Sequence, residues 1–354
     1  MKYFFYTALA GLFGILLVYA GDLGIKLVYH DIFDNLGEVS YQAAAVGTTL
    51  TSDVKSATGG PTSDVVTLTF VGDLMLDRGV RNSVVKNGGG DYSWLFAKLD
   101  NFPGDAILFG NLEGPLSDVG VDRQNLYSFR MSPAALPAIK NAGFQVLSVA
   151  NNHVGDWGRA AFTDTISRLA AAGLAAGGGG QNRAEAVAPK IITASSGERV
   201  GFLAFSDVGP NELAATETEA GIILASDPVL PQIISQAANV VDILVISFHW
   251  GDEYQTRSNA RQQTLAHLAI DNGAKLVIGH HPHVIQEPEY YKEGVIAYSL
   301  GNFIFDQYFS QATMTGLVLT IEFQDRKISA ARRQKVTLDS DFRPSVTDLD
   351  ESDG

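Results

Sequence analysis

Acidic, amide and imidazole side chains recur directly after short apolar runs of this chain. The runs are rich in Val, Ile, Leu and Phe, and each is followed within a few positions by a residue that can bind a metal ion. These residues are Asp73, Asn111, Glu113, Asn152, His153, Asp156, His249, Glu253, His280, His281, His283 and Asn302. Carboxylates, amides and imidazoles are the groups with which proteins bind hard to borderline divalent metals. The pattern therefore predicts a metal site assembled from several segments.

The absence of cysteine narrows the chemistry of such a site. With no Cys in the chain, a thiolate-ligated zinc site, an iron–sulfur cluster, a cysteine nucleophile and a disulfide framework are excluded. The remaining ligands suit Mn, Zn, Fe, Ca or Mg. Such an ion polarises a phosphoryl or carbonyl oxygen and makes bound water nucleophilic near neutral pH. The donor set thus points to metal-assisted hydrolysis or transfer.

Two local spacings suggest roles within this set. His281 and His283 flank Pro282, so both imidazoles can point into one site from a single stiff loop. Histidine has a reference pKa of about 6.5, which suits general acid or base work. His153 is therefore a candidate for that role, and Asp156 would orient it if the loop folds back. No G-x-S-x-G or G-x-G-x-x-G element follows a strand, which argues against serine-hydrolase and dinucleotide sites.

The apolar runs have the length and composition of strands buried on both faces. They cover residues 65–71, 106–109, 145–149, 200–205, 241–248, 275–278 and 295–299. Helical patterns separate several of them, as at 159–172 and 258–272, each followed by a glycine. This alternation predicts an α/β fold with a large parallel component, in which ligands bind beyond the carboxyl ends of the strands. Two later runs, 315–323 and 327–338, predict an antiparallel hairpin.

The first residues form an uncharged apolar stretch. Residues 3–20 follow Lys2 and are long enough to nearly cross a hydrocarbon core of about 30 Å. Two interpretations stay open: an uncleaved membrane anchor, or a signal peptide cleaved after Val18-Tyr19-Ala20. Both direct the remaining chain out of the cytoplasm. The predicted organisation is an anchor or signal segment at 1–21, a linker at 22–64, one domain at 65–338 and an acidic tail at 339–354.

The charge balance limits the partners of this chain. Its 354 residues include 25 Lys and Arg against 39 Asp and Glu, which gives a formal net charge of −14. A chain this acidic has no general basic surface for nucleic acid. It also repels an anionic polymer unless a metal ion or a local basic patch intervenes.

Six segments of the chain occur in the order of a known family's motifs. They are VGDLMLDR (71–78), GNLEGPLSD (110–118), SVANNHVGDWG (148–158), SFHWGDEY (247–254), VIGHHPHVIQ (277–286) and YSLGNFIFD (298–306). In these segments, which span about residues 65–310, the chain resembles the poly-gamma-glutamate capsule biosynthesis (CapA-type) family of the calcineurin-like metallophosphoesterase superfamily. The resemblance implies a four-layer α/β/β/α sandwich with a metal centre at the strand ends.

The resemblance also implies roles for individual residues. Position by position, it gives metal ligands at Asp73, Glu113, Asn152, His249, His281 and His283, and an acid catalyst at His153 with Asp156 beside it. The candidate substrate-binding residues are Asn111, Arg130, Trp250, Glu253, His280 and Asn302. Two positions depart from the wider superfamily: Met75 stands where its Asp-x-His opening has histidine, and Glu113 substitutes for its metal-bridging aspartate. We therefore expect one or two ions of Mn, Zn or Fe.

Two functions are compatible with this resemblance. The first is an extracytoplasmic, metal-dependent hydrolase-like protein that takes part in the synthesis or export of an anionic envelope polymer of the poly-gamma-glutamate type. The second is a non-catalytic, membrane-anchored subunit of a capsule synthase complex, in which a metal bridges the protein's carboxylates to those of the polymer. Both predict the polymer and other capsule-synthesis membrane subunits as partners, and neither predicts nucleic acid.

Overall fold

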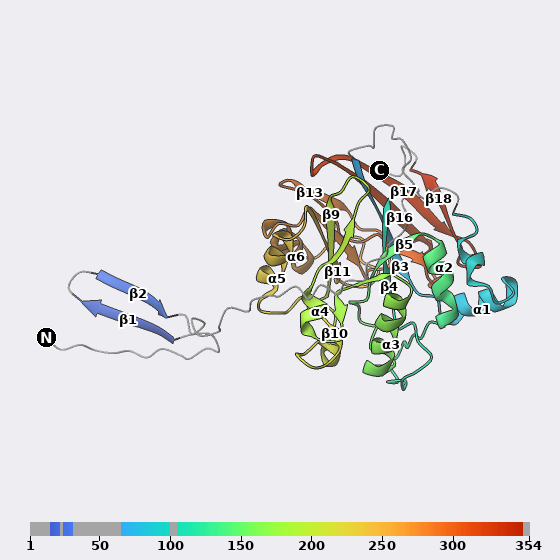
Figure 1. Cartoon of the computed structure of the whole chain (residues 1–354), viewed down its shortest axis with the longest axis horizontal. Coiled ribbons are helices and arrows are strands. Elements are labelled where there is room, and N and C mark those ends of the chain that lie inside the picture. The colour runs from blue at the N-terminus through green and yellow to red at the C-terminus, as the bar shows by residue number, and fades with distance from the viewer. Residues whose placement is uncertain (1–14, 22–23, 31–64, 100–104, 350–354) are drawn as a thin grey trace, which may run out of the picture. The chain divides into compact units, whose positions relative to one another are not determined.

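The computed structural model describes residues 15–21, 24–30, 65–99 and 105–349. Its contacts divide the chain into two compact units, Met1–Thr58 and Gly59–Gly354, each of which is described by itself. In the first unit, β1 (Ile15–Gly21) pairs antiparallel with β2 (Gly24–His30), and Ile15 lies opposite His30 (Figure 1).

The end of the predicted anchor or signal segment is therefore a strand. The sequence predicted an apolar span over residues 3–20, and β1 occupies the last positions of that span. Residues 1–14 and most of the predicted linker lie outside the described residues. Among the helices of the described part of the chain, none combines the length and the apolar character that crossing a membrane requires.

The first large sheet has eight strands, with β18-β17-β16-β3-β4-β5-β6 side by side and β15 also paired with β3. Its strands β3 to β6 and β15 pair in parallel, whereas β16, β17 and β18 add antiparallel strands at one edge. The strand bounds are β3 (Val65–Leu74), β4 (Ile107–Leu112), β5 (Phe144–Ser148), β6 (Ala175–Gly177), β15 (Asn302–Ile304), β16 (Thr315–Gln324), β17 (Lys327–Leu338) and β18 (Pro344–Asp348).

The second large sheet has six strands in the order β13-β14-β12-β11-β9-β8, and β9, β11, β12 and β14 run parallel. A separate short pair joins β7 (Gly179–Gly180) to β10 (Gly221–Ile222). The bounds in the six-stranded sheet are β8 (Lys190–Thr193), β9 (Arg199–Ser206), β11 (Ile243–His249), β12 (Leu276–His280), β13 (Pro288–Tyr291) and β14 (Gly294–Ala297).

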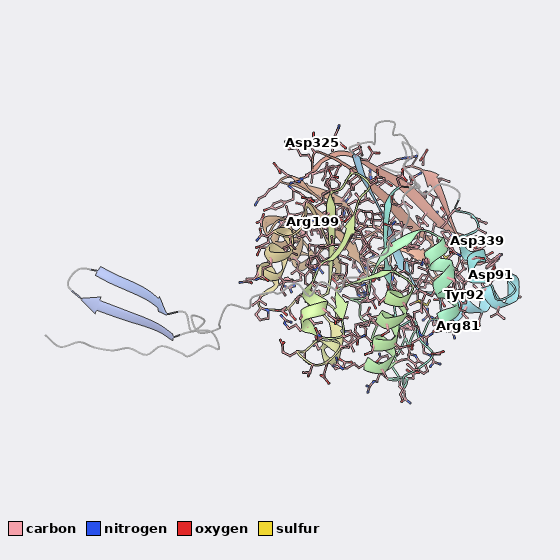
Figure 2. All side chains as sticks on the ribbon, in the orientation of Figure 1. Arg81, Asp91, Tyr92, Arg199, Asp325 and Asp339 are labelled. Carbon is pink, nitrogen blue, oxygen red and sulfur yellow. The ribbon has the colours of Figure 1, made fainter. Side chains whose placement is uncertain are left out.

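Most helices follow the predicted alternation with strands. Both helices singled out from the sequence form, and the second begins at a capping box in which Asn259 and Gln262 bond each other's backbone N–H groups. A short 3-10 turn begins after Asp91, which Figure 2 labels. The Asp91 side chain accepts the Ser93 N–H at 2.9 Å. The helical segments are α1 (Arg78–Asn87), η2 (Tyr92–Phe96), η3 (Pro133–Ala135), α2 (Leu136–Asn141), α3 (Gly158–Ala171), α4 (Arg183–Val187), η4 (Asn211–Leu213), α5 (Leu230–Ala238), α6 (Ala260–Asp271) and η5 (Ala312–Met314).

Three apolar clusters define the layers of the second unit. One lies between the two large sheets, where the Phe109 ring of β4 stacks on the Phe202 ring of β9 with centroids 5.8 Å apart. A second cluster joins α1, α2 and α3 to the outer face of the eight-stranded sheet. A third joins α5 and α6 to the outer face of the six-stranded sheet. The predicted α/β class is thus confirmed, with helices outside and two sheets inside (Figure 1).

The C-terminal strands confirm one prediction and correct another. β16 and β17 form the predicted antiparallel hairpin, with Asp325 in its turn (Figure 2). Asp325 has φ 53°. The sequence predicted an acidic tail from residue 339, but Pro344–Asp348 forms β18 and pairs with β17. The alternation of Ser345, Val346 and Thr347 puts Val346 against the core, which explains why this acidic stretch folds.

Candidate metal centre

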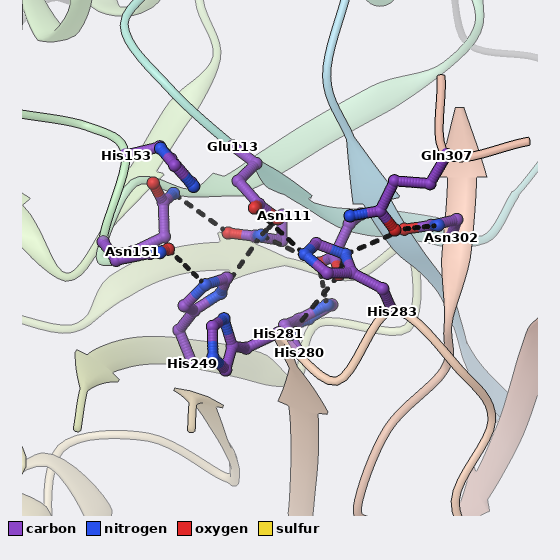
Figure 3. A network of polar contacts seen from close by, with 12 residues as sticks. Asn111, Glu113, Asn151, His153, His249, His280, His281, His283, Asn302 and Gln307 are labelled. Carbon is purple, nitrogen blue, oxygen red and sulfur yellow. Dashed lines mark hydrogen bonds and ion pairs between the residues drawn. The ribbon is translucent and has the colours of Figure 1, made fainter. Parts of the chain in front are cut away.

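The carboxyl ends of both large sheets bring the predicted site residues together. Asp73, near the end of β3, lies opposite Asn111 of β4 and Asn302 of β15 in the sheet register. His249 and His280 end β11 and β12 as neighbours in the other sheet. The two sheets meet where Asp73 Oδ1 lies 3.1 Å from His280 Nδ1. Figure 3 shows this convergence of amide, carboxylate and imidazole groups.

One set of ligating side chains, the inner group, consists of Asp73, Glu113 and His249. All three residues are buried, and one ligand atom from each lies within 4.8 Å of the others. The Asn111 amide nitrogen contacts all three: it lies 2.8 Å from Asp73 Oδ1, 3.3 Å from Glu113 Oε2 and 3.4 Å from His249 Nδ1. An N–H donor thus contacts a ligand atom of each member of this group, where a cation would need lone pairs instead.

Asn151 fixes the orientation of this amide. The Asn151 Nδ2 group donates to the Leu112 carbonyl at 2.8 Å, which identifies it as the nitrogen, and also to Asn111 Oδ1 at 3.2 Å. Asn111 Oδ1 therefore faces Asn151, and Asn111 Nδ2 faces the inner group.

A second set, the outer group, consists of Glu253, His281 and His283, whose ligand atoms also lie within 4.8 Å of one another. The Tyr254 N–H donates to the Pro282 carbonyl at 2.8 Å and ties the two contributing loops together. Tyr254, His281 and His283 all have positive φ, at 64°, 97° and 58°. Non-glycine residues adopt this backbone at a cost that functional sites commonly retain.

Unpaired buried atoms favour a cation at this place. Glu113 Oε1 and His281 Nδ1 are buried without a hydrogen-bond partner, and such orphans are rare in folded proteins. An imidazole nitrogen and carboxylate oxygens are also the donors that a divalent ion takes. The residues present therefore fit a metal ion. The two groups differ in one respect: within the described chain, no amide nitrogen contacts all members of the outer group, as the Asn111 nitrogen does in the inner group.

The carboxylates of the centre differ in charge. Burial acts to raise the pKa of Asp73, but contacts with His280 and His283 outweigh it and hold this pKa well below its usual value. Burial raises the pKa of Glu113 well above its usual value, because His283 compensates only part of the lost hydration. Asp73 is thus the fixed negative charge of the centre.

The imidazoles differ in the same way. Burial acts to lower the pKa of His283, but the Glu113 and Asp73 carboxylates raise it to about 9. Burial and the neighbouring His283 lower the pKa of His281 to about 3. Burial and His281 hold the pKa of His249 well below its usual value. His281 and His249 are therefore neutral at pH 7, which is the form that binds metal.

His153 and Asp156 form a pair, as their spacing predicted. His153 Nδ1 lies 2.8 Å from Asp156 Oδ2, and the same oxygen accepts the Phe129 N–H at 2.8 Å. Asn125 Nδ2 donates to the other Asp156 oxygen at 2.8 Å. The carboxylate thus fixes one imidazole nitrogen and leaves His153 Nε2 for a ligand.

The remaining predicted residues contact the centre or lie beside it. Asn152 Oδ1 lies 2.8 Å from His249 Nε2, and Asn302 Oδ1 lies 3.0 Å from His283 Nδ1. The Arg130 guanidinium stacks on the Trp157 ring, 3.6 Å from its centroid. These positions place Asn152 at the inner group, Asn302 at the outer group, and Arg130 on a neighbouring loop.

The position of Trp250 contradicts the prediction that this residue binds substrate. We predicted it as a substrate-binding residue, but it is fully buried and stacks on Phe248 with centroids 4.7 Å apart. Its indole N–H donates to the Tyr298 carbonyl at 2.9 Å. Residues two apart on an extended segment share a face, so Trp250 continues the outward face of β11 and packs in the core.

Sequence reasoning missed several residues that hold the centre in place. Asn151 orients Asn111, and Gln307 bonds both Asn302 and the Tyr254 hydroxyl. The Phe129 ring packs against the His153 ring at a tilt of 35°, with centroids 4.0 Å apart. Asn151 and Gln307 are polar residues at or just beyond strand ends, so their position was a usable signal. No feature of the sequence pointed to Phe129.

Comparison with known proteins adds an independent observation. A family model described as "Bacterial capsule synthesis protein PGA_cap" matches residues 67–307. The chain is 34% identical over 267 residues to the "Capsule biosynthesis protein CapA" of Bacillus anthracis, covering 72% of this chain and 64% of that one. It is 33% identical over 257 residues to the "PGA biosynthesis protein CapA" of Bacillus subtilis (strain 168), covering 72% and 67%. The chain thus spans about two thirds of the length of these relatives.

Solved structures with similar folds are more distant. The calcineurin-like phosphoesterase YfkN from Bacillus subtilis is 14% identical, with a TM-score of 0.42 and coverage of 80% of this chain and 90% of that one. TT1561 of Thermus thermophilus is 11% identical, with a TM-score of 0.39 and coverage of 75% and 98%. The family match, and not these likenesses, is the basis for assigning a function.

Proposed function

The chain belongs to the bacterial capsule synthesis protein family PGA_cap, and from this premise we propose that it is an extracytoplasmic, metal-dependent hydrolase-like protein of anionic-polymer synthesis or export. The polymer would be of the poly-gamma-glutamate type, by analogy with the name of the Bacillus subtilis relative. One observation carries the hydrolase part: carboxylates and imidazoles from both sheets converge around unpaired buried ligand atoms, beside an oriented histidine.

We assign the ion to the outer group, with one equivalent per chain. Glu253, His281 and His283 supply three donors, and the backbone bond from Tyr254 to Pro282 keeps them together. The inner group already has the Asn111 N–H donor between its three members. Glu253 thus moves from the predicted substrate contacts to the proposed metal ligands, and Asp73 and His249 become the surroundings that orient them.

The chain's own residues supply the rest of the chemistry. A bound divalent ion would polarise the oxygen of the bond to be broken. His153 Nε2 would hold or deliver a proton at the leaving atom, because Asp156 fixes the opposite ring nitrogen. The Phe129 ring packs at a tilt against the His153 ring, with centroids 4.0 Å apart, and limits how that ring can turn.

The N-terminal stretch supports the proposed location, and the relatives support the proposed partners. The apolar residues 3–20 support export of the second unit, by an anchor or a cleaved signal. The names of the relatives support an anionic polymer and other capsule-synthesis membrane subunits as partners. Fractionation of cells that express the full-length chain, with protease added from outside, tests the location.

Metal stoichiometry and polymer cleavage test the function itself. The purified full-length chain should contain one equivalent of Mn, Zn or Fe by elemental mass spectrometry. It should also shorten poly-gamma-glutamate or hydrolyse a phosphoester substrate. Asp73→Ala and His249→Ala should abolish turnover while circular dichroism stays unchanged. A folded protein without any bound metal would refute the proposal.

A non-catalytic polymer-binding subunit is the alternative that one observation favours. Met75, at the position where the superfamily has a metal-binding histidine, is fully buried, and its sulfur accepts the Asp77 N–H at 3.3 Å. Metal-dependent binding of poly-gamma-glutamate without any shortening of the polymer would establish this alternative in place of the hydrolase.

A further inference from the structure

Arg123 and Arg130 differ from most arginines of this acidic chain in forming no ion pair. Elsewhere in the described chain, arginines pair with carboxylates, as Arg168 does with Asp118 and Asp164. Within the described residues, the arginines without an ion pair are Arg123, Arg130, Arg257 and Arg333. Two of these four come from one loop next to the proposed centre.

Arg130 is held in a fixed orientation by its backbone and by Trp157. Its N–H donates to Asp77 Oδ2 at 2.7 Å, and its carbonyl accepts a bond from Arg81. The guanidinium lies over the Trp157 ring, 3.6 Å from its centroid. Stacking occupies the face of a guanidinium and leaves the N–H groups in its plane free to bind an oxyanion.

Arg123 contacts the same short segment as Arg130, residues 156–158. Its backbone N–H donates to the Asp156 carbonyl at 2.8 Å. Its guanidinium lies over Gly158, where a Cβ atom would come within 2.9 Å of Arg123 Nη2. Gly158 has φ 76°, so both its backbone and its missing side chain suit this close approach. The two guanidiniums thus both pack against Asp156–Gly158.

The same loop is attached to the proposed acid catalyst. Phe129, next to Arg130, packs its ring at a tilt of 35° against the His153 ring and donates its N–H to Asp156. Asn125, close to Arg123, bonds the other Asp156 oxygen. A group bound at these arginines is therefore a neighbour of the group at His153.

We propose that Arg123 and Arg130, with Trp157 as their support, form an oxyanion-binding site beside His153, here named the arginine corner. It binds a carboxylate or a phosphoryl group of the ligand next to the group at the metal. The inference rests on the proposed function in one respect, that the ligand is an anionic polymer. A local basic site of this kind lets a chain of net charge −14 approach a polyanion.

The test measures binding to the chelator-treated full-length chain, so that no metal bridges the ligand. The probes are a fluorescent poly-gamma-glutamate oligomer and, separately, inorganic phosphate. Arg130→Gln and Arg123→Gln should each weaken binding about tenfold, because each removes a charge-assisted hydrogen-bonding group. Arg333→Gln on β17 makes the same charge change on an exposed strand and should change affinity by less than about twofold.

Two further variants separate geometry from net charge. Arg130→Lys keeps the charge but loses the planar fork, so it should recover only part of the affinity. Trp157→Leu keeps every charge and should still weaken binding, since Arg130 loses its support. Unchanged melting temperature and circular dichroism will show that each variant is folded.

Each outcome decides between the proposals. Loss confined to the oligomer assigns the arginine corner to carboxylates, and loss confined to phosphate assigns it to a phosphoryl group. Equal weakening by Arg130→Gln and Arg333→Gln, or no weakening by either corner variant, overturns the inference and leaves the metal-dependent function intact. A wild-type chain that binds neither probe overturns the arginine corner, while its metal content still tests the proposed function separately.

Discussion

The inner and outer groups contain similar ligands but differ in what lies between them. The inner group is buried and its three members share the Asn111 amide nitrogen. The outer group lies on two loops with positive φ at His281 and His283, and His281 Nδ1 has no partner. Each group thus keeps one buried ligand atom without a hydrogen-bond partner, Glu113 Oε1 in the inner group and His281 Nδ1 in the outer one, but only the inner group has an amide donor in contact with all three members.

This difference indicates that the inner group positions side chains, whereas the outer group binds the ion. Residues on rigid strand ends form a hydrogen-bonded base, and residues on loops supply the open coordination positions. Hydrogen bonds within a buried polar network fix the geometry of its members, and unpaired ligands on the strained outer loop favour an added ion. Substitutions that change one group at a time will show whether this division holds.

Removing the carboxylate of the outer group should have the largest effect. Glu253→Gln removes the one carboxylate of the outer group and leaves a neutral His281 and a protonated His283, so the full-length chain should lose its metal on dialysis. Even residues that merely support metal ligands change affinity by about 10–100-fold, so we expect a loss of at least about 100-fold. Isothermal titration with Mn or Zn and elemental mass spectrometry will measure it.

Asp252 offers a matched control for this change. It precedes Glu253 directly, is exposed, and bonds the Asn259 side chain at 2.9 Å, outside both groups. Asp252→Asn should keep one equivalent of metal. Retention of metal by Glu253→Gln as well would show that the inner group, not the outer one, holds the ion.

Changing Asn111 should convert the inner group into a second metal site. Asn111→Asp replaces the N–H donor by a carboxylate oxygen between Asp73, Glu113 and His249. The metal-free variant should be destabilised by about 3–5 kcal/mol, because a buried negative charge faces another, and metal should restore its melting temperature. Metal content should rise from one equivalent to two.

The same substitution at the surface controls for the added charge. Asn239 follows α5 and is exposed, so Asn239→Asp should change neither metal content nor stability by more than about 0.5 kcal/mol. A wild-type protein that already contains two equivalents would contradict the assignment of the Asn111 amide to the inner group.

The sequence predicted the strand-end residues well because their position follows from local pattern. Asp73, His249 and His280 stand at the ends of apolar runs, and parallel strands end at the same edge of a sheet. The face that Phe248 and Trp250 share was also accessible from the alternation of side chains. Applying that alternation one residue beyond the strand would have placed Trp250 in the core.

The outer group could not be predicted in the same way. Its assembly depends on the bond between Tyr254 and Pro282, which are far apart in the sequence, and on positive φ at residues that usually avoid it. The amide of Asn111 likewise has two orientations, and only its contact with Asn151 decides between them. Long-range contacts of this kind leave no periodic signal along the chain.

Acidification should weaken metal binding through the outer group. The carboxylates around His283 raise its pKa to about 9, so at pH 7 the metal-free imidazole carries a proton that the ion must displace. Affinity should therefore fall by about tenfold per pH unit as the pH drops below about 9. His281, with a pKa of about 3, should add no dependence near neutrality.

Titrations at pH 6, 7 and 8 will measure this slope, and His267 provides a matched control. That histidine lies on α6, stacks on Tyr291 and bonds Glu289 at 2.8 Å, away from the centre. His267→Gln should leave the slope unchanged. An affinity that is the same at all three pH values would mean that the ion does not bind His283.

The smallest effect on metal binding should come from Trp250, which stands between the two groups in the chain. Trp250→Phe keeps an aromatic ring on Phe248 but leaves the Tyr298 carbonyl without its 2.9 Å donor. An unsatisfied buried acceptor costs about 1–3 kcal/mol of unfolding free energy, measured by urea denaturation. Metal affinity should change less than about threefold, since Trp250 packs in the core and the bond from Tyr254 to Pro282 still holds Glu253 near His281. A loss of metal comparable to that of Glu253→Gln would show instead that the end of β11, which carries His249, and the loop that carries Glu253 act as one unit.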